Sequence, residues 1–100
     1  MIDTTILDDE GKLTKEGLIE MGIRLRKVND YFSMPIVKFA KRCDISPSTL
    51  KHWYNGARPT SDKNKKAFNR LIETYHINKE WLFYGKGSIF DDRGIPNFKK

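Results

Sequence analysis

The chain has 100 residues, 38% of them hydrophobic, and a formal net charge of +6. This length suits one modest domain, and the hydrophobic fraction is too high for a disordered chain. The sequence has no apolar run near the roughly 20 residues of a membrane span, no signal peptide, and one cysteine, which excludes an internal disulfide. We therefore expect a cytoplasmic protein that makes no contact with a membrane.

The positive charge is concentrated in the middle of the chain. Residues 1–23 contain two lysines and six acidic residues, a net charge of −4, whereas residues 24–70 contain twelve basic and three acidic residues, a net charge of +9. A basic block of this kind suits a surface that binds a polyanion, and it equally suits a solvated face that keeps the protein soluble. Charge alone leaves both interpretations open.

The first two predicted helices follow from apolar spacing and capping residues. We expect residues 1–13 to be irregular. Thr14 has the short hydroxyl of an N-cap, and the apolar residues after it are spaced three and four apart: Leu18, Met21, Leu25, Val28 and Phe32. Ser33 is expected to cap a second helix, with Pro35 in its first turn. The apolar face of that helix is predicted to comprise Ile36, Val37, Phe39, Ala40 and Cys43, the last as a core residue.

Three further helices are predicted after Asp44 interrupts the pattern. Ser46 and Pro47 are the N-cap and first residue of a third helix that runs to about Tyr54. Ser61 or Asp62 opens a fourth helix, whose apolar side is Ala67, Phe68, Leu71, Ile72 and Tyr75. A fifth helix covers residues 79–84, between an Asn78 cap and a stop at Gly85, with Trp81 and Leu82 inward.

These elements define the expected organisation of the chain. No convincing strand occurs in residues 14–87, so the predicted fold class is all-α. Residues 14–87 form one domain of five helices, preceded by an N-terminal extension, residues 1–13. A C-terminal tail, residues 88–100, has no clear period.

The segment between Ile36 and Asn55 has the features of two helices that cross at a tight turn. Ala40 is small enough for a close approach, Asp44 visits the left-handed backbone region more easily than most residues, and Ile45 supplies an apolar plug. Leu50 and Trp53 are predicted to anchor the second helix of the pair to the core. The opposite side is left polar and free: Ser48, Thr49, Lys51, His52 and Asn55.

This pattern resembles the helix-turn-helix of phage repressors of the lambda and Cro type. Residues 39–59, FAKRCDISPSTLKHWYNGARP, carry the resemblance, and residues 77–87, INKEWLFYGKG, are similar to the closing segment of phage CI repressor domains. The resemblance covers residues 18–87 and implies a lambda-repressor-like fold of five helices. Ile36 stands where the family often has a glutamine that contacts phosphate, so that contact is not carried over. Asp44 stands where the family has the turn glycine.

The resemblance also implies a function. It predicts a sequence-specific transcriptional regulator, a repressor of phage or prophage type, that binds an operator in the major groove of double-stranded DNA as a homodimer. The base-reading residues would be Ser48, Thr49, Lys51 and His52. The phosphate-binding residues would be Lys38, Ser46, Asn55 and Arg58, with nonspecific attraction from Lys63, Lys65 and Lys66.

Alternatives remain at this stage. An antitoxin would use the same helix-turn-helix and also bind a toxin, and a protein-interaction module would use the basic face against an acidic partner. The dimerising C-terminal domain of many CI repressors has no counterpart here, which leaves a short regulator or a fragment. His52 and His76 lie far apart, the chain has a single cysteine, and no catalytic motif is recognisable. We therefore expect no enzymatic activity, metal, cofactor or small-molecule ligand.

Overall fold

The computed structural model describes residues 14–97 and contains five helices there: α1 (Lys15–Tyr31), α2 (Ile36–Arg42), α3 (Pro47–Tyr54), α4 (Asp62–Thr74) and α5 (Lys79–Tyr84). The predicted all-α fold with five helices is confirmed. In the described range the strand pairing is limited to one isolated antiparallel bridge, between Ile77 and Phe90. None of the described helices is long and apolar enough to cross a membrane. The predicted irregular extension, residues 1–13, lies outside the described residues.

Four of the five helices begin at a side-chain cap that the sequence predicts. The hydroxyls of Thr14, Ser46 and Ser61 each accept a hydrogen bond from the backbone N–H three residues ahead, at 3.0, 3.1 and 3.1 Å. The Asn78 side-chain oxygen accepts from the Glu80 N–H at 3.1 Å. Each cap satisfies one of the donors that a helix start leaves without a partner. The fourth helix is thereby opened by Ser61, and Asp62 is its first residue.

The start of α2 differs from the prediction that Ser33 caps it. Ser33 has a left-handed backbone, φ 53°, and its N–H donates to the Asp30 carbonyl at 3.0 Å, so it terminates α1. Pro35 is extended and precedes the helix instead of lying in its first turn, and α2 has no side-chain cap. Val37, predicted on the apolar face, is 59% exposed. Within the short helix α2, only Phe39 and Ala40 are buried.

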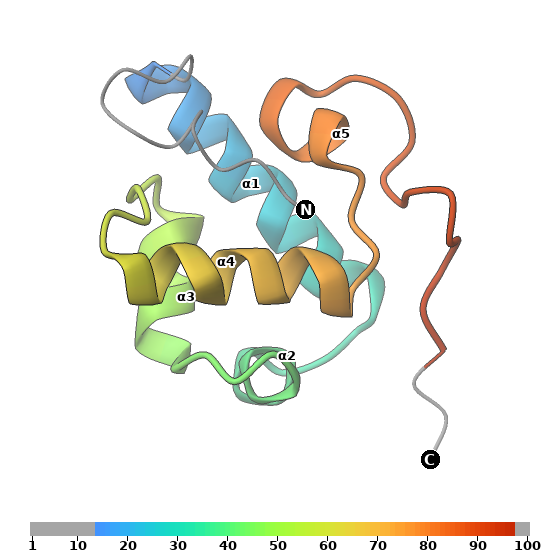
Figure 1. Cartoon of the computed structure of the whole chain (residues 1–100), viewed down its shortest axis with the longest axis horizontal. Helices are drawn as coiled ribbons and strands as arrows, with labels where there is room; N and C mark the ends of the chain where they lie inside the picture. Colours follow the sequence, from blue (N-terminus) through green and yellow to red (C-terminus); the bar gives the residue numbers. More distant parts are fainter. Residues whose placement is uncertain (1–13, 98–100) are drawn as a thin grey trace.

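One hydrophobic core joins all five helices. α1 packs against α3 and α5, and α2 packs against α3. Figure 1 shows α4 crossing in front of α1, with α2 on one side of it and α5 on the other. The ring of Phe68 on α4 contacts Trp53 of α3 edge-on, with centroids 5.1 Å apart, and stacks at 6.2 Å on Phe83 of α5. Phe83 is buried, whereas Trp81, predicted to point inward, is only partly buried.

The close approach of α1 and α3 depends on one glycine. A Cβ atom at Gly22 would lie 2.5 Å from the carbonyl oxygens of both Trp53 and Tyr54. Real Cβ atoms do not come so close to backbone atoms, so any larger residue would push α3 away from α1. The absence of a side chain at Gly22 therefore sets where the C-terminal end of α3 rests.

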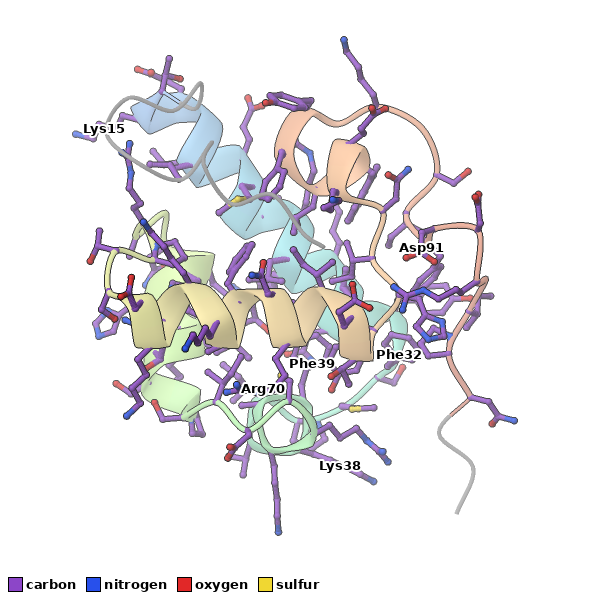
Figure 2. All side chains as sticks on the ribbon, viewed as in Figure 1. Lys15, Phe32, Lys38, Phe39, Arg70 and Asp91 are labelled. Atoms are coloured by element: carbon purple, nitrogen blue, oxygen red, sulfur yellow. The ribbon has the colours of Figure 1, made fainter. Side chains whose placement is uncertain are left out.

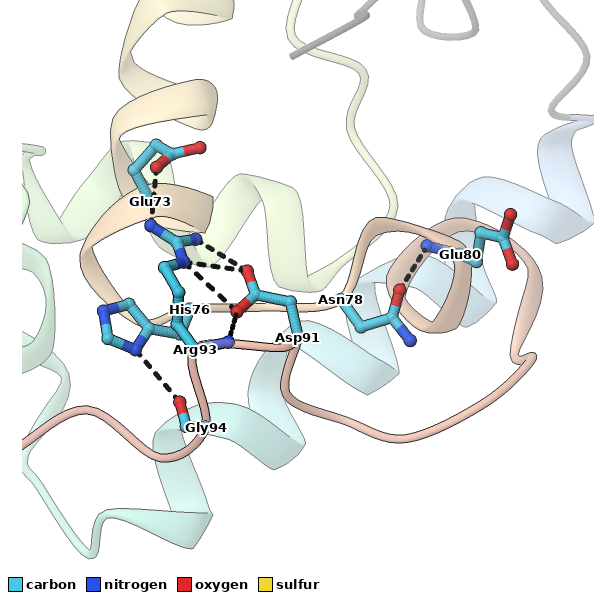
Figure 3. A network of polar contacts seen from close by, with 7 residues as sticks. All are labelled: Glu73, His76, Asn78, Glu80, Asp91, Arg93 and Gly94. Carbon is cyan, nitrogen blue, oxygen red and sulfur yellow. Dashed lines mark hydrogen bonds and ion pairs between the residues drawn. The ribbon is translucent and has the colours of Figure 1, made fainter. Parts of the chain in front are cut away.

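The segment after α5 packs on the domain, although its sequence has no helical or strand period. Phe90 is 9% exposed and its ring lies 5.1 Å from that of Tyr31. The Asp91 N–H donates to the His76 carbonyl at 2.8 Å. Arg93 pairs with Asp91 at 2.6 Å and with Glu73 of α4 at 2.8 Å, the network drawn in Figure 3. Part of the predicted tail thus closes over the end of α4.

Candidate nucleic-acid interface

The turn between α2 and α3 has the geometry of a Schellman C-cap. Asp44 is left-handed, with φ 58°, as predicted. Its N–H donates to the Lys41 carbonyl at 3.1 Å, and the Ile45 N–H donates to the Ala40 carbonyl at 3.0 Å. These are the two bonds that close such a motif after a helix. Ala40 is fully buried and Ile45 is 8% exposed, so the predicted close contact and apolar plug are both present.

α3 divides into an inner and an outer face, as its spacing predicts. Leu50 and Trp53 are 0% and 2% exposed and hold the helix on the core. The predicted polar side chains lie on the outside, with four of them exposed: Ser48, Lys51, His52 and Asn55. The outer face is therefore polar along the length of the helix.

Two predicted DNA-contacting hydroxyls are engaged within α3. The Ser46 hydroxyl accepts from the Thr49 N–H and donates to the Thr49 hydroxyl oxygen at 2.8 Å. Thr49 is half-buried. Since the Ser46 proton is directed at Thr49, the geometry assigns Ser46 to capping, and its contact with a phosphate stays a prediction. The Thr49 hydroxyl retains its own proton for an outside acceptor.

A groove of about 430 Å³ lies beside α3, between α1 and the start of α2. Lys51 and Asn55 line it from the α3 side, and Arg26 and Asp30 line it from α1. Met34 and Ile36 supply apolar surface. Arg26 was not predicted as a site residue, because only its position off the apolar stripe of α1 is visible in the sequence. The fold brings this cation to the C-terminal end of α3.

A buried polar network lies under this groove. Asn29, 5% exposed, donates from its side chain to the Met34 carbonyl at 2.8 Å. The Tyr54 hydroxyl donates to the Asn29 side-chain oxygen at 2.8 Å. Burial of the phenol, and next the Asp30 carboxylate, raise the pKa of Tyr54 above its usual range. Its hydroxyl therefore keeps the proton and ties the last turn of α3 to α1.

A second groove, of about 300 Å³, borders the other end of α3. Asp44, Ser46 and Thr49 line it, and Lys63 reaches it from α4. Arg70 of α4 also lines it, with its guanidinium bonded to the carbonyls of Cys43 and Asp44. Three lysines were expected to attract DNA nonspecifically, and only one of them, Lys63, lines this groove at the start of α3. Cations from α1 and α4 therefore flank the polar face of α3 at both ends.

The remaining predicted phosphate contacts lie on other elements. Lys38 is exposed on the outside of α2, on the side away from Phe39 in Figure 2, and Arg58 is half-buried in the loop after α3. Neither lines the two grooves beside α3. The eight predicted residues thus form one compact outer face on α3 together with two separate flanking positions.

Cys43 belongs to the core, as predicted. It is 1% exposed, and its thiol donates to the Phe39 and Ala40 carbonyls at 3.5 Å. Burial raises the pKa of the Cys43 thiol to about 12, so it stays protonated at neutral pH. In the described part of the chain, no three side chains of the metal-binding types gather into a possible site.

No family model matches the chain, and neither a curated protein nor a solved structure matches it. The likeness to phage repressors therefore rests on the motifs at residues 39–59 and 77–87.

Proposed function

We propose that the protein binds double-stranded DNA sequence-specifically by inserting α3 into the major groove. One observation carries the proposal: a helix anchored by Leu50 and Trp53 exposes a polar outer face, and a groove at each end of it holds a cation from another helix, Arg26 at one end and Lys63 at the other. An α-helix with its side chains is about 10–12 Å in diameter. The major groove is about 12 Å wide and accepts such a helix.

The chemistry of the outer face supports separate tasks along α3. Lys51 suits the acceptor edge of guanine, Ser48 and His52 can each donate or accept, and the Thr49 methyl suits thymine. Asn55 and Arg26 both line the larger groove, and each can donate hydrogen bonds to a phosphate bound there. Phosphate contacts of this kind position the protein, and base contacts specify the sequence.

We further propose that the protein acts as a transcriptional repressor of phage or prophage type, as a homodimer. The resemblance of residues 39–59 to phage repressors supports this part. In that arrangement two copies would contact half-sites about 34 Å apart, one helical turn of DNA.

The first experiment is selection of bound sequences from a random pool of DNA duplexes. We expect enrichment of one motif, repeated with inverted symmetry at a spacing of one helical turn. An enriched motif without symmetry would retain DNA recognition and refute the dimer. No enrichment at any salt concentration would refute the proposed function and favour a protein-binding role for the basic face.

A matched pair of variants tests the groove. Arg26→Ala should make the slope of log affinity against log salt shallower by about 0.9, the contribution of one phosphate contact. Lys27→Ala removes the same charge from the next position of α1, which does not line the groove. It should leave the slope within error of the unaltered protein. Equal changes in both variants would show that general charge, and not the groove, attracts the DNA.

A further inference from the structure

The carbonyls at the end of α2 need partners that the turn itself does not supply. The last carbonyls of a helix have no intrahelical donors. The Schellman bonds use the carbonyls of Ala40 and Lys41. The carbonyls of Cys43 and Asp44 lie directly past the helix, where the chain changes direction. α3 begins three residues after Asp44. The orientation of these two peptide groups therefore sets the direction in which α3 leaves the turn.

Arg70 of α4 donates to both of these carbonyls. Its Nε atom lies 2.9 Å from the Cys43 oxygen, and its Nη2 atom lies 3.1 Å from the Asp44 oxygen. Figure 2 shows Arg70 between α4 and α2. The planar guanidinium presents these two donors in a rigid fork, and a charged donor forms a stronger bond than a neutral one. Two adjacent peptide groups are thus held in one orientation.

A second link from α4 holds the helix before the turn. The Tyr75 hydroxyl donates to the Phe39 carbonyl at 2.7 Å, and the Tyr75 ring stacks on the Phe39 ring with centroids 4.1 Å apart. α4 is therefore bonded to α2 at Phe39 and to the turn at Cys43 and Asp44. With α2 held by Tyr75, the bonds of Arg70 act on the turn alone.

We propose that Arg70 is a positioning residue for DNA recognition, which clamps the turn between α2 and α3 so that α3 meets base edges in one orientation. The inference rests on the proposed function, which it deepens. Arg70 needs no contact with DNA for this role. Its effect should fall on sequence-specific binding, which requires exact placement of α3, and should spare nonspecific binding, which requires charge.

Arg70→Lys is the test variant because it keeps the charge and cannot form the two-pronged contact. We expect the dissociation constant for the selected operator to rise about tenfold, equal to about 1.4 kcal/mol. The dissociation constant for random DNA and the salt slope should stay unchanged. Hydrogen exchange at the Asp44 and Ile45 amides, both bonded within the turn, should accelerate, while the melting temperature shows that the domain remains folded.

Arg93→Lys is the matched control. It makes the same change in an arginine that pairs with Asp91 and Glu73, away from the turn, and should leave operator binding and turn exchange unchanged. The inference would be overturned if Arg70→Lys bound the operator, and exchanged its turn amide hydrogens, as the unaltered protein does. An equal loss of operator and random-DNA affinity would overturn it too, by making Arg70 a DNA contact. Absence of operator binding in the unaltered protein would instead overturn the proposed function.

Discussion

The α2–α3 unit, residues 36–55, and the C-terminal segment, residues 76–97, use their charged side chains in opposite ways. In the C-terminal segment, Arg93 is bound by two carboxylates, Asp91 and Glu73. In the α2–α3 unit, Lys51 and His52 are exposed and make no ion pair with any residue of the described range 14–97. A cation with internal partners serves the fold, whereas exposed donors on a well-anchored helix can bind an outside polyanion.

The two regions also differ in how their backbone is held. The turn at Asp44 is closed by bonds to Ala40 and Lys41 within one stretch of chain, and Arg70 of α4 adds two bonds from outside it. The segment around Phe90 is held by remote aromatic partners: Tyr31 at the end of α1 and Phe32 directly after it. The comparison predicts that changes beneath α3 alter stability, changes on its outer face alter DNA binding, and changes in the C-terminal segment alter stability slightly.

The largest expected effect is that of Leu50→Ala. Leu50 is fully buried under α3, and truncating such a side chain leaves a cavity. We expect a loss of about 2–5 kcal/mol in the free energy of unfolding, measured by denaturant titration. Below the new melting temperature the variant should still discriminate operator from random DNA. Loss of discrimination in the folded variant would show that the core under α3 also sets specificity.

Gly22→Ala should have the next largest effect on stability. The added Cβ would press on the carbonyls of Trp53 and Tyr54 and displace α3 from α1. We expect overpacking to cost about 1–3 kcal/mol of unfolding free energy, measured in the same titration. Operator affinity should fall further than this loss of stability explains, because α3 itself moves. A variant as stable as the unaltered protein would show that α1 and α3 separate easily.

Lys51→Ala should change DNA reading without changing stability. Its effect on unfolding should stay within about 0.5 kcal/mol, since the side chain is exposed. Discrimination at one base position of each half-site should fall by about 1–3 kcal/mol, measured by competition between operator variants.

Lys86→Ala is its control, because this exposed lysine follows α5 and lines neither groove beside α3. It should leave discrimination intact. If Lys51→Ala weakens binding to every sequence equally, Lys51 holds a phosphate together with Arg26 and does not read a base.

The smallest expected effect is that of Arg93→Gln. The hydrogen bond from Arg93 lowers the pKa of Asp91 below its ordinary value of 3.8. A lowered folded-state pKa stabilises the protein above the unfolded pKa, and the gain disappears as pH falls through the folded pKa. Because the pair is partly exposed, we expect a loss of about 0.5 kcal/mol or less at pH 7. Melting temperatures of the two proteins should converge below pH 3.8, and a constant gap would place the contribution outside the ion pair.

Features that depend on near neighbours in the chain were predictable. Apolar spacing predicts the inner faces of the helices apart from Val37 on α2 and Trp81 on α5. The four side-chain caps act on N–H groups two or three residues away. The division of α3 into buried Leu50 and Trp53 and exposed Lys51 and His52 follows from the same period. The predicted cap of α2 was wrong. Ser33 is suited both to end α1 and to start α2, and in the structure it ends α1.

Only the tertiary structure decided which distant residues support the candidate site. Arg26 lies 25 positions before Lys51 and Arg70 lies 26 positions after Asp44, and no local period links either pair. The same holds for the docking of Phe90 on α1 and for the contact of Gly22 with α3. Helix periodicity and capping are set by a few successive backbone angles, which the sequence encodes directly. The placement of one helix on another depends on the summed packing of side chains from the whole chain, and residues such as Arg70 acquire their partners only when that packing is complete.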